Sequence, residues 1–265
     1  MRDHFTQDRA ALEALLPQLT LHDWQRSTAA SPWVVRDVVS HLLGDDLSRL
    51  ARMRDAHAVD VPAADETFEA FIHRLNDEWV RAAARVSPQL LIDMLAVTTP
   101  QVLNLWRTTD LDSTGAPVSW AGPEPAPVWL DCARDFTEYW VHQQQIREAT
   151  GRAGAAEPKV VNAVLDTFLR AMPYTLAGQN RPGDSTLTVV VDGAGGGRWS
   201  WRCAGRRWLP VDHHGTSTAT VVVDVDVLWR LCVRMIEPDD AERRARVRGE
   251  HELATAALQI VSIIR

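Results

Sequence analysis

DCARDFTEYWVHQQQIREATG, residues 131–151, is the stretch of sequence that decides how the first half of this chain folds. Apolar side chains recur here and just upstream at the three- and four-residue spacing of an α-helix. They are Trp129, Ala133, Phe136, Trp140, Val141 and Ile146. Gly151 stands where a helix commonly ends, because glycine accepts the left-handed conformation of a C-cap. The pattern predicts a helix over 128–150.

A polar stripe follows one side of this predicted helix. Glu138 and His142 are four positions apart, so they lie on the same face, about 40° apart around the axis. Asp135 and Gln145 extend the stripe by three residues in each direction. A spacing of four is what two helical metal ligands need, since one turn brings both donor atoms to one point. The same spacing more often marks a solvated face or a structural pair, so by itself it does not identify a metal site.

The rest of the first half also has helical periodicity. Ser31-Pro32-Trp33 has serine at a cap and proline in a first turn, and it predicts the start of a helix. A loop rich in glycine and proline, 110–127, precedes the helix at 128–150. The other helices are expected over 5–20, 33–52, 65–86 and 88–106. Neighbouring helices joined by loops favour an up-and-down bundle of four main helices.

The second half is mixed in character. The Gly-bearing, Pro-terminated stretch at 151–158 is the best domain boundary, which predicts one domain over 1–155 and another over 156–265. Helices are expected over 159–178, 226–236 and 250–265, and strands over 187–193, 198–204, 207–211 and 219–225. This order predicts a small α+β domain, so the whole chain is an α+β protein of two domains.

Composition excludes several classes of function. The formal net charge is -7, which argues against general affinity for nucleic acid or an anionic membrane. Three cysteines, far apart and outside any CxxC pattern, fit a reducing compartment better than a disulfide framework. The N-terminus lacks the layout of a signal peptide, and no apolar run approaches the roughly 20 residues of a membrane span. We therefore expect a cytoplasmic protein, monomeric or homodimeric, without a nucleic-acid or membrane partner.

A second histidine completes a possible ligand set, and with it the chain resembles a known family. The run SPWVVRDVVSHLLGDDLSRL, residues 31–50, places His41 beside an apolar face and one turn before Asp45. This run, together with TEYWVHQQQIREATGR at 137–152, resembles the two ligand helices of mycothiol-dependent maleylpyruvate isomerase-like proteins, which belong to the DinB-like four-helix superfamily. The second half is similar to that family's sterol-carrier-like C-terminal domain, more loosely than the two helices match.

The resemblance implies a metal site. In that family a metal, usually zinc, is held by one histidine of the first motif and by the glutamate and histidine of the second. The matching residues here are His41, Glu138 and His142. Zinc is expected, although another divalent metal such as nickel would suit the same ligands. Three protein ligands leave a fourth position open, as in catalytic zinc sites. Asp45, Asp135 and Gln145 are candidates for orienting the histidine rings.

The resemblance also implies an activity: an enzyme that uses the metal to activate mycothiol, a low-molecular-weight thiol, for attack on an electrophilic small molecule. The outcome is either thiol transfer or a maleylpyruvate-type cis-trans isomerisation, and the three ligands do not decide between them. Two other functions stay open, a non-catalytic binding protein with a structural metal and a metal-dependent hydrolase. The family also uses an arginine, which the sequence does not place. Candidates are Arg74, Arg81, Arg85, Arg134 and Arg230.

Overall fold

The structure is a computed structural model that describes residues 1–152 and 157–263. These residues form two compact units. The first contains 1–111 and 134–152, and the second contains 112–133 and 157–263. The boundary expected between 155 and 156 lies outside the described residues.

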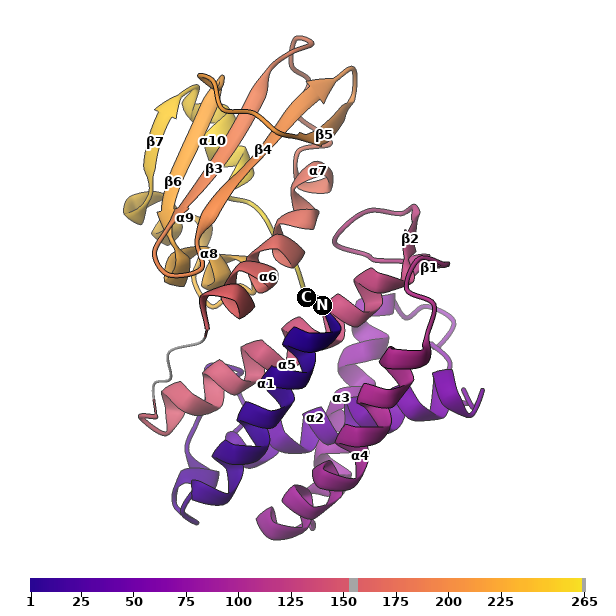
Figure 1. Ribbon diagram of the computed structural model, residues 1–265. Helices are drawn as coiled ribbons and strands as arrows, with labels where there is room; N and C mark the ends of the chain where they lie inside the picture. Colours follow the sequence, from indigo (N-terminus) through magenta and orange to yellow (C-terminus); the bar gives the residue numbers. More distant parts are fainter. Residues whose placement is uncertain (153–156, 264–265) are drawn as a thin grey trace. The chain divides into compact units, whose positions relative to one another are not determined.

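The first unit is helical, as the periodicity predicts (Figure 1). Its long helices are α1 (Arg2–Leu15), α2 (Val35–Arg49), α3 (Phe68–Ala83), α4 (Pro88–Thr108) and α5 (Val128–Ala149). Short 3₁₀ turns follow α1 at Leu16–Gln18 and precede α2 at Asp23–Gln25, and α2 continues into a π-helical turn at Leu50–Arg54. The first six residues of α5, 128–133, belong to the second unit and the remainder to the first.

Side-chain contacts give the directions of the four helices that form the bundle. Arg2 on α1 contacts the carbonyl of Trp106 on α4, and Arg9 contacts Thr99, so these two helices are antiparallel. Helices α2 and α5 are also antiparallel, because Glu138 lies at the level of His41 and Asp135 at the level of Arg49. Helix α3 packs on α2, where the Trp79 indole donates a hydrogen bond to the Ser40 carbonyl at 2.6 Å.

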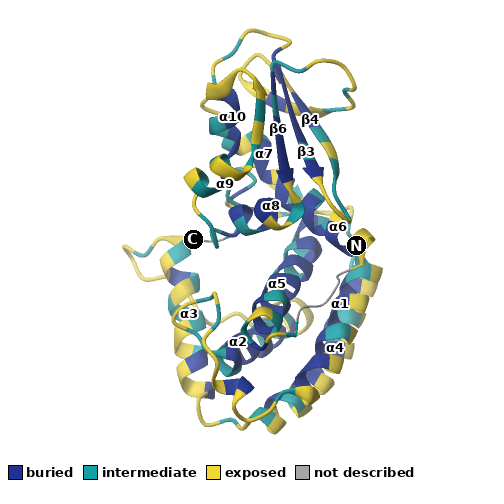
Figure 2. Cartoon of the chain, turned by 90° about the vertical axis from the view of Figure 1, so that its left-hand side faces the viewer, coloured by how far each residue is buried: buried dark blue, intermediate teal, exposed yellow. Residues whose placement is uncertain are grey.

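Apolar burial explains why these segments fold together. On α2 the fully buried side chains include Val35, Val38, Val39, Leu42 and Leu43. Phe136 and Ile146 on α5 are equally enclosed. Figure 2 shows these buried stretches of α2 and α5 in dark blue. Burial of such side chains stabilises a fold by about 1.5–3 kcal/mol each.

The start of α2 differs from the prediction. Ser31-Pro32-Trp33 precedes the helix instead of opening it, and the Ser31-Pro32 bond is cis. The helix begins at Val35, where the Asp37 carboxylate accepts a hydrogen bond from the Val34 amide at 3.2 Å. The Val35 amide instead bonds the Arg26 carbonyl, at 3.0 Å. A serine before a proline was a misleading cap signal, because the chain makes a backbone turn there.

The second unit combines a sheet with short helices, which confirms the α+β prediction. Its helices are α6 (Pro158–Phe168), α7 (Met172–Thr175), α8 (Val225–Cys232), α9 (Pro238–Arg244) and α10 (His251–Ala257), with a 3₁₀ turn at Leu169–Ala171. Its sheet contains β3 (Thr186–Asp192), β4 (Gly197–Ala204), β5 (Arg207–Val211), β6 (Ala219–Asp224) and β7 (Arg246–Gly249). A separate hairpin pairs β1 (Thr114–Pro117) with β2 (Pro125–Pro127).

The sheet has the order β5-β4-β3-β6-β7. Strands β3 and β6 are parallel, and every other pair is antiparallel. Leu187, Val189 and Val191 on β3 are buried, as are Val221 and Val223 on β6. Helix α10 lies behind these strands in Figure 1 and packs against β6. The apolar residues of the central strands therefore form the core of this unit.

Among the described helices, none combines the length and the apolar character that crossing a membrane requires.

Candidate metal centre

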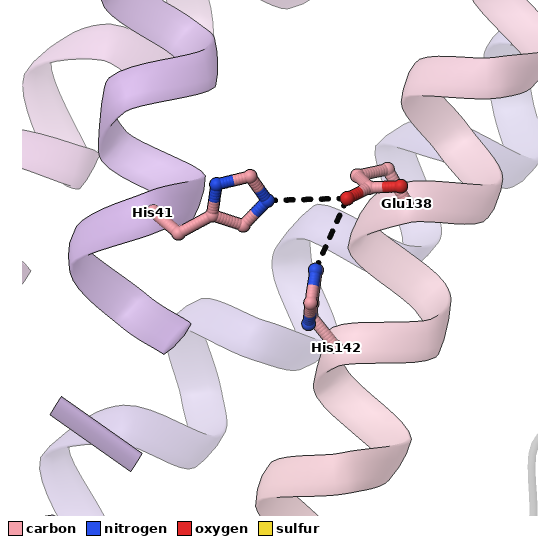
Figure 3. A group of neighbouring side chains, drawn as sticks. All are labelled: His41, Glu138 and His142. Atoms are coloured by element: carbon pink, nitrogen blue, oxygen red, sulfur yellow. Dashed lines mark hydrogen bonds and ion pairs between the residues drawn. The ribbon is translucent and has the colours of Figure 1, made fainter. Parts of the chain in front are cut away.

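Three predicted ligands converge between α2 and α5 (Figure 3). His41 projects from α2, and Glu138 and His142 project from successive turns of α5. One donor atom from each side chain lies within 4.8 Å of the other two. The Nε2 atoms of both histidines are 3.1 Å from the same carboxylate oxygen, Oε1 of Glu138. The two helices therefore bring two imidazoles and one carboxylate to a single point.

The site is enclosed around the histidines and open at the carboxylate. The side chain of His41 is 4% exposed and that of His142 9%, whereas Glu138 remains 40% exposed. The indole ring of Trp33 lies against this pair, with its centroid 5.0 Å from that of His41 and 6.5 Å from that of His142. A molecule from solvent therefore has access on the carboxylate side.

Two of the three predicted orienting residues contact the histidines. The amide oxygen of Gln145 is 2.7 Å from His142 Nδ1, which fixes this nitrogen as the donor and leaves Nε2 directed into the site. A carboxylate oxygen of Asp45 lies 3.4 Å from His41 Nε2.

The third predicted orienting residue, Asp135, is engaged elsewhere. Its carboxylate accepts hydrogen bonds from the Arg49 guanidinium and, at 2.9 Å, from the Trp106 indole. It joins α2, α4 and α5 about one turn before Glu138 and two turns before His142. Asp135 does lie on the same polar stripe as Glu138 and His142. The stripe extends beyond the site, however, and Asp135 at its end binds other helices instead of a histidine.

The electrostatics of the site favour a positive charge. Burial by itself would lower the pKa of His41, but Asp45 and then Glu138 outweigh it and raise that pKa to about 9. Burial raises the pKa of the Asp45 carboxyl to about 6. Although Glu138 is partly exposed, the loss of water around its carboxyl acts to raise its pKa, yet hydrogen bonds from His142 and His41 hold that pKa well below its ordinary value. The carboxylates of Asp45 and Glu138 therefore keep the buried His41 ring protonated, and a bound metal cation would take the place of that proton.

The donor set fits a divalent metal. Zinc is commonly held by histidine nitrogens and a carboxylate oxygen, and three such ligands leave a position for a further one. At metal–ligand distances of about 2.0–2.2 Å, tetrahedral donors are about 3.4 Å apart, close to the 3.1 Å contacts that Glu138 makes with His41 and with His142. The hydrogen bond from His142 to Gln145 is the outer contact that metal-bound histidines usually make.

The structure does not single out any of the five candidate arginines as the one expected at the site. Arg74 pairs with Glu66 and Glu78, and Arg81 lies 3.7 Å from Asp77. In the second unit Arg230 bonds Asp226 and stacks on Trp229. The last two candidates are Arg85, which is exposed beyond the end of α3, and Arg134, which is half-buried on α5. The expected arginine therefore stays unassigned.

Sequence reasoning missed two residues beside the site. Trp33 was interpreted as part of a helix start, and no spacing rule signals that its ring lies on the histidines. Tyr139 was hidden between Glu138 and Trp140 on the apolar side of α5, where it resembles an ordinary core residue. Its hydroxyl reaches α2, which only the packing of the two helices reveals.

Comparison with known proteins places the first half of the chain. Residues 5–147 match the family described as the Mycothiol maleylpyruvate isomerase N-terminal domain. Two uncharacterized proteins from two strains of Mycobacterium tuberculosis are each 26% identical to the chain over 194 residues, 72% of either sequence.

Solved structures agree with the fold of both units. A crystal structure of the mycothiol-dependent maleylpyruvate isomerase matches with a TM-score of 0.56 at 10% identity, over 87% of this chain and 86% of that one. A histidine-to-alanine mutant of that isomerase matches with a TM-score of 0.57 at 11% identity, over 94% and 92% of the two chains. At these identities the likeness shows the fold.

Proposed function

This chain belongs to the Mycothiol maleylpyruvate isomerase N-terminal domain family, and from that premise we propose that it is a metal-dependent enzyme that activates a low-molecular-weight thiol for attack on an electrophilic small molecule. The observation that carries the proposal is the convergence of His41, Glu138 and His142, with donor atoms within 4.8 Å of one another. The family name and the names of the structural neighbours suggest mycothiol as the thiol.

The residues of the chain have separate tasks in this proposal. His41, Glu138 and His142 would hold the metal, zinc in the first instance and nickel as the next choice. Gln145 keeps the His142 ring in the orientation that directs Nε2 into the site. Trp33 covers the histidine side and excludes water there, while the exposed side of Glu138 leaves room for substrates. A bound divalent metal would supply the positive charge that ionises a thiol at neutral pH.

Two reactions follow from an activated thiolate. Attack on an electrophilic carbon forms a carbon–sulfur bond, and retention of that bond, with departure of a leaving group or protonation of the adduct, gives a thiol S-transferase. If the carbon belongs to a cis carbon–carbon double bond, addition of the thiolate converts that double bond into a single bond, about which rotation is free. Rotation and elimination then restore the double bond in the trans form and return the thiol. The name of the structural neighbours favours isomerisation, and thiol transfer stays the alternative reaction.

The proposal is tested by a screen of thiols against electrophiles, read by mass spectrometry with metal content measured on the same sample. We expect turnover only when metal and thiol are both present. His142→Ala should remove the metal and the activity together. Gln144→Leu, a change on the same helix at a half-buried position that is not one of the ligands, should leave both unchanged.

Thiol binding should also release about one proton per site near neutral pH, because the thiol must ionise to ligate. Calorimetry in buffers of different ionisation enthalpy measures that proton directly. Full turnover without any thiol, and without proton release, would contradict thiol activation and favour a hydrolase. A ligand retained unchanged in the presence of metal and thiol would favour a binding protein.

A further inference from the structure

The side chain that follows Glu138 in sequence forms a direct polar link between the two helices of the site. The hydroxyl of Tyr139, on α5, lies 2.6 Å from the backbone carbonyl of Leu42 and 2.7 Å from a carboxylate oxygen of Asp46, both on α2. Tyr139 is only 2% exposed, so water does not compete for these acceptors. Its hydroxyl hydrogen is shared between two acceptors one helical turn apart.

The link lies at the level of the candidate metal ligands on both helices. Tyr139 is adjacent to Glu138, and Leu42 is adjacent to His41. A change in the distance between the Tyr139 hydroxyl and Leu42 therefore changes the distance between His41 and the two ligands on α5. Metal ligation is sensitive to such changes, because ligand distances are confined to within about 0.2 Å of their preferred values.

The Asp46 carboxylate, one of the two acceptors on α2, is also held in place by residues of α1 and α4. The Asp46 carboxylate accepts two hydrogen bonds from the Arg9 guanidinium, at 2.9 and 2.6 Å, and one from the Thr98 hydroxyl at 2.5 Å. Arg9 and Asp46 are each 1% exposed, and the Arg9 guanidinium carbon lies 3.9 Å from the centroid of the Tyr139 ring. A buried ion pair with every oxygen engaged is rigid, because moving one member leaves a charge without a partner.

We propose that Tyr139 is a positioning residue of the candidate metal centre: its hydroxyl fixes the separation of α2 and α5 at the level of the ligands and so sets the affinity of His41, Glu138 and His142 for the metal. The inference rests on the proposed metal centre and adds a residue that does not contact the metal. A purely structural role for the same bond is the alternative. In that case its loss would lower stability and leave the metal affinity of the folded protein unchanged.

The experiment compares Tyr139→Phe with Thr98→Val in the full-length protein. Both variants remove one hydroxyl that bonds the Asp46 carboxylate, but only Tyr139→Phe removes a link between α2 and α5. Zinc affinity is measured by competition with a chelator, and the visible spectrum of the cobalt-loaded protein reports the ligand geometry. Circular dichroism establishes that each variant is folded at the temperature of the measurement.

We expect Tyr139→Phe to weaken zinc binding about tenfold, the lower end of the effect of an outer contact, and to alter the cobalt spectrum. Thr98→Val should stay within twofold of the wild type in affinity. Equal affinities for Tyr139→Phe and the wild type would overturn the inference, as would equal losses in the two variants. Failure of the wild-type protein to bind any metal would overturn the metal centre itself and this inference with it.

A second measurement needs no change at Tyr139. The chain contains two tyrosines, and the other, Tyr174, is 49% exposed in the second unit. Incorporation of 3-fluorotyrosine therefore gives two ¹⁹F signals, which Tyr174→Phe assigns. On titration with zinc we expect the Tyr139 signal to shift to completion at one equivalent while that of Tyr174 stays in place. A Tyr139 signal that does not respond to bound zinc would show that the hydroxyl is not coupled to the site.

Discussion

The orientation of the His142 ring depends on a single amide oxygen, that of Gln145, which lies 2.7 Å from Nδ1. Gln145→Leu keeps a side chain of similar size but removes this acceptor. We expect metal affinity to fall about tenfold to a hundredfold, because the imidazole loses the contact that fixes its tautomer and its direction. Chelator competition measures the change. Gln144→Leu serves as the matched control, and equal affinities for the two variants would contradict an orienting role for Gln145.

A second residue-scale feature is a buried carboxyl on α1. One oxygen of Asp8 accepts a hydrogen bond from the Gln143 side chain at 2.8 Å, and the other is buried without a hydrogen-bond partner among the described residues. Burial raises the pKa of Asp8 to about 7, against the opposing charges of Arg9 and Arg147. The folded protein therefore holds this proton up to neutral pH, whereas the unfolded chain releases it near its ordinary pKa of 3.8.

The sign of the resulting pH dependence follows from proton binding. Between about pH 4 and pH 7 the folded state binds more protons at Asp8 than the unfolded state, so stability falls as the pH rises. The stabilisation of the folded state by the proton on Asp8 is present in full below pH 4 and is lost as the pH rises through 7. Asp8→Asn removes this loss, and at pH 8 it should raise the free energy of unfolding by up to about 4 kcal/mol relative to the wild type.

Urea unfolding of the wild type and Asp8→Asn from pH 4.5 to pH 8 measures this difference. The comparison isolates Asp8, since other titrating groups are common to both proteins. Asp3→Asn, an exposed change on the same helix, should leave the pH profile unchanged. Parallel stability profiles for the wild type and Asp8→Asn would contradict the raised pKa.

At the residue scale, sequence spacing predicted correctly those site residues that lie close together on one helix. The i, i+4 relation of Glu138 and His142 follows from helix geometry, and the resemblance supplied His41. The contacts of Asp135 with Arg49 and of Tyr139 with Leu42 were not predictable in this way. They depend on the rotation of α2 against α5, and a single sequence holds no measure of that rotation.

At the scale of elements, α2 and α3 pack closely because of one glycine. A Cβ built at Gly44 would lie 2.5 Å from the Trp79 ring, much closer than side chains approach one another. The same indole donates its hydrogen bond to the Ser40 carbonyl, so it has little room to move. Helix propensity favours alanine over glycine by about 1 kcal/mol. Here we expect the clash to dominate, and Gly44→Ala to destabilise the protein by about 1–3 kcal/mol.

A double-mutant cycle tests this packing. In a Trp79→Ala background the clash is absent, so Gly44→Ala should become neutral or stabilising, as propensity predicts. Chemical denaturation of the four proteins gives the coupling between the two positions. A stabilising effect of Gly44→Ala in the wild-type background would show that the indole moves aside at little cost.

Elements with strong periodicity were predicted well, and those defined by pairing were not. The helix expected over 128–150 is α5, Val128–Ala149, and the strand expected over 219–225 is β6, Ala219–Asp224. Strand β7, Arg246–Gly249, has alternating arginines and only one partly buried apolar residue, so it lacks a strand signal. It exists because β6 offers a free edge to pair with.

At the scale of the whole molecule, composition and the order of elements predicted a helical first half and a mixed second half. The grouping of residues 112–133 with the second unit was not predicted. This segment contains the β1–β2 hairpin and the first six residues of α5. The Arg170 guanidinium of the second unit stacks over the Trp129 ring at 5.2 Å. A break in the periodicity marks where helices end, but not which unit a connecting segment packs against.

A chain cut after residue 155 tests this division. All three candidate ligands lie in the first unit, so the shortened chain should still bind one metal ion. The segment 112–133 loses its partners in the second unit, however, and α5 carries two ligands beyond it. We therefore expect an affinity several-fold below that of the full chain, together with binding of an apolar fluorescent dye to the newly exposed surface. A shortened chain with unchanged affinity and no dye binding would show that 112–133 folds with the bundle. A chain that binds no metal would show that the centre requires the second unit to keep α5 in place.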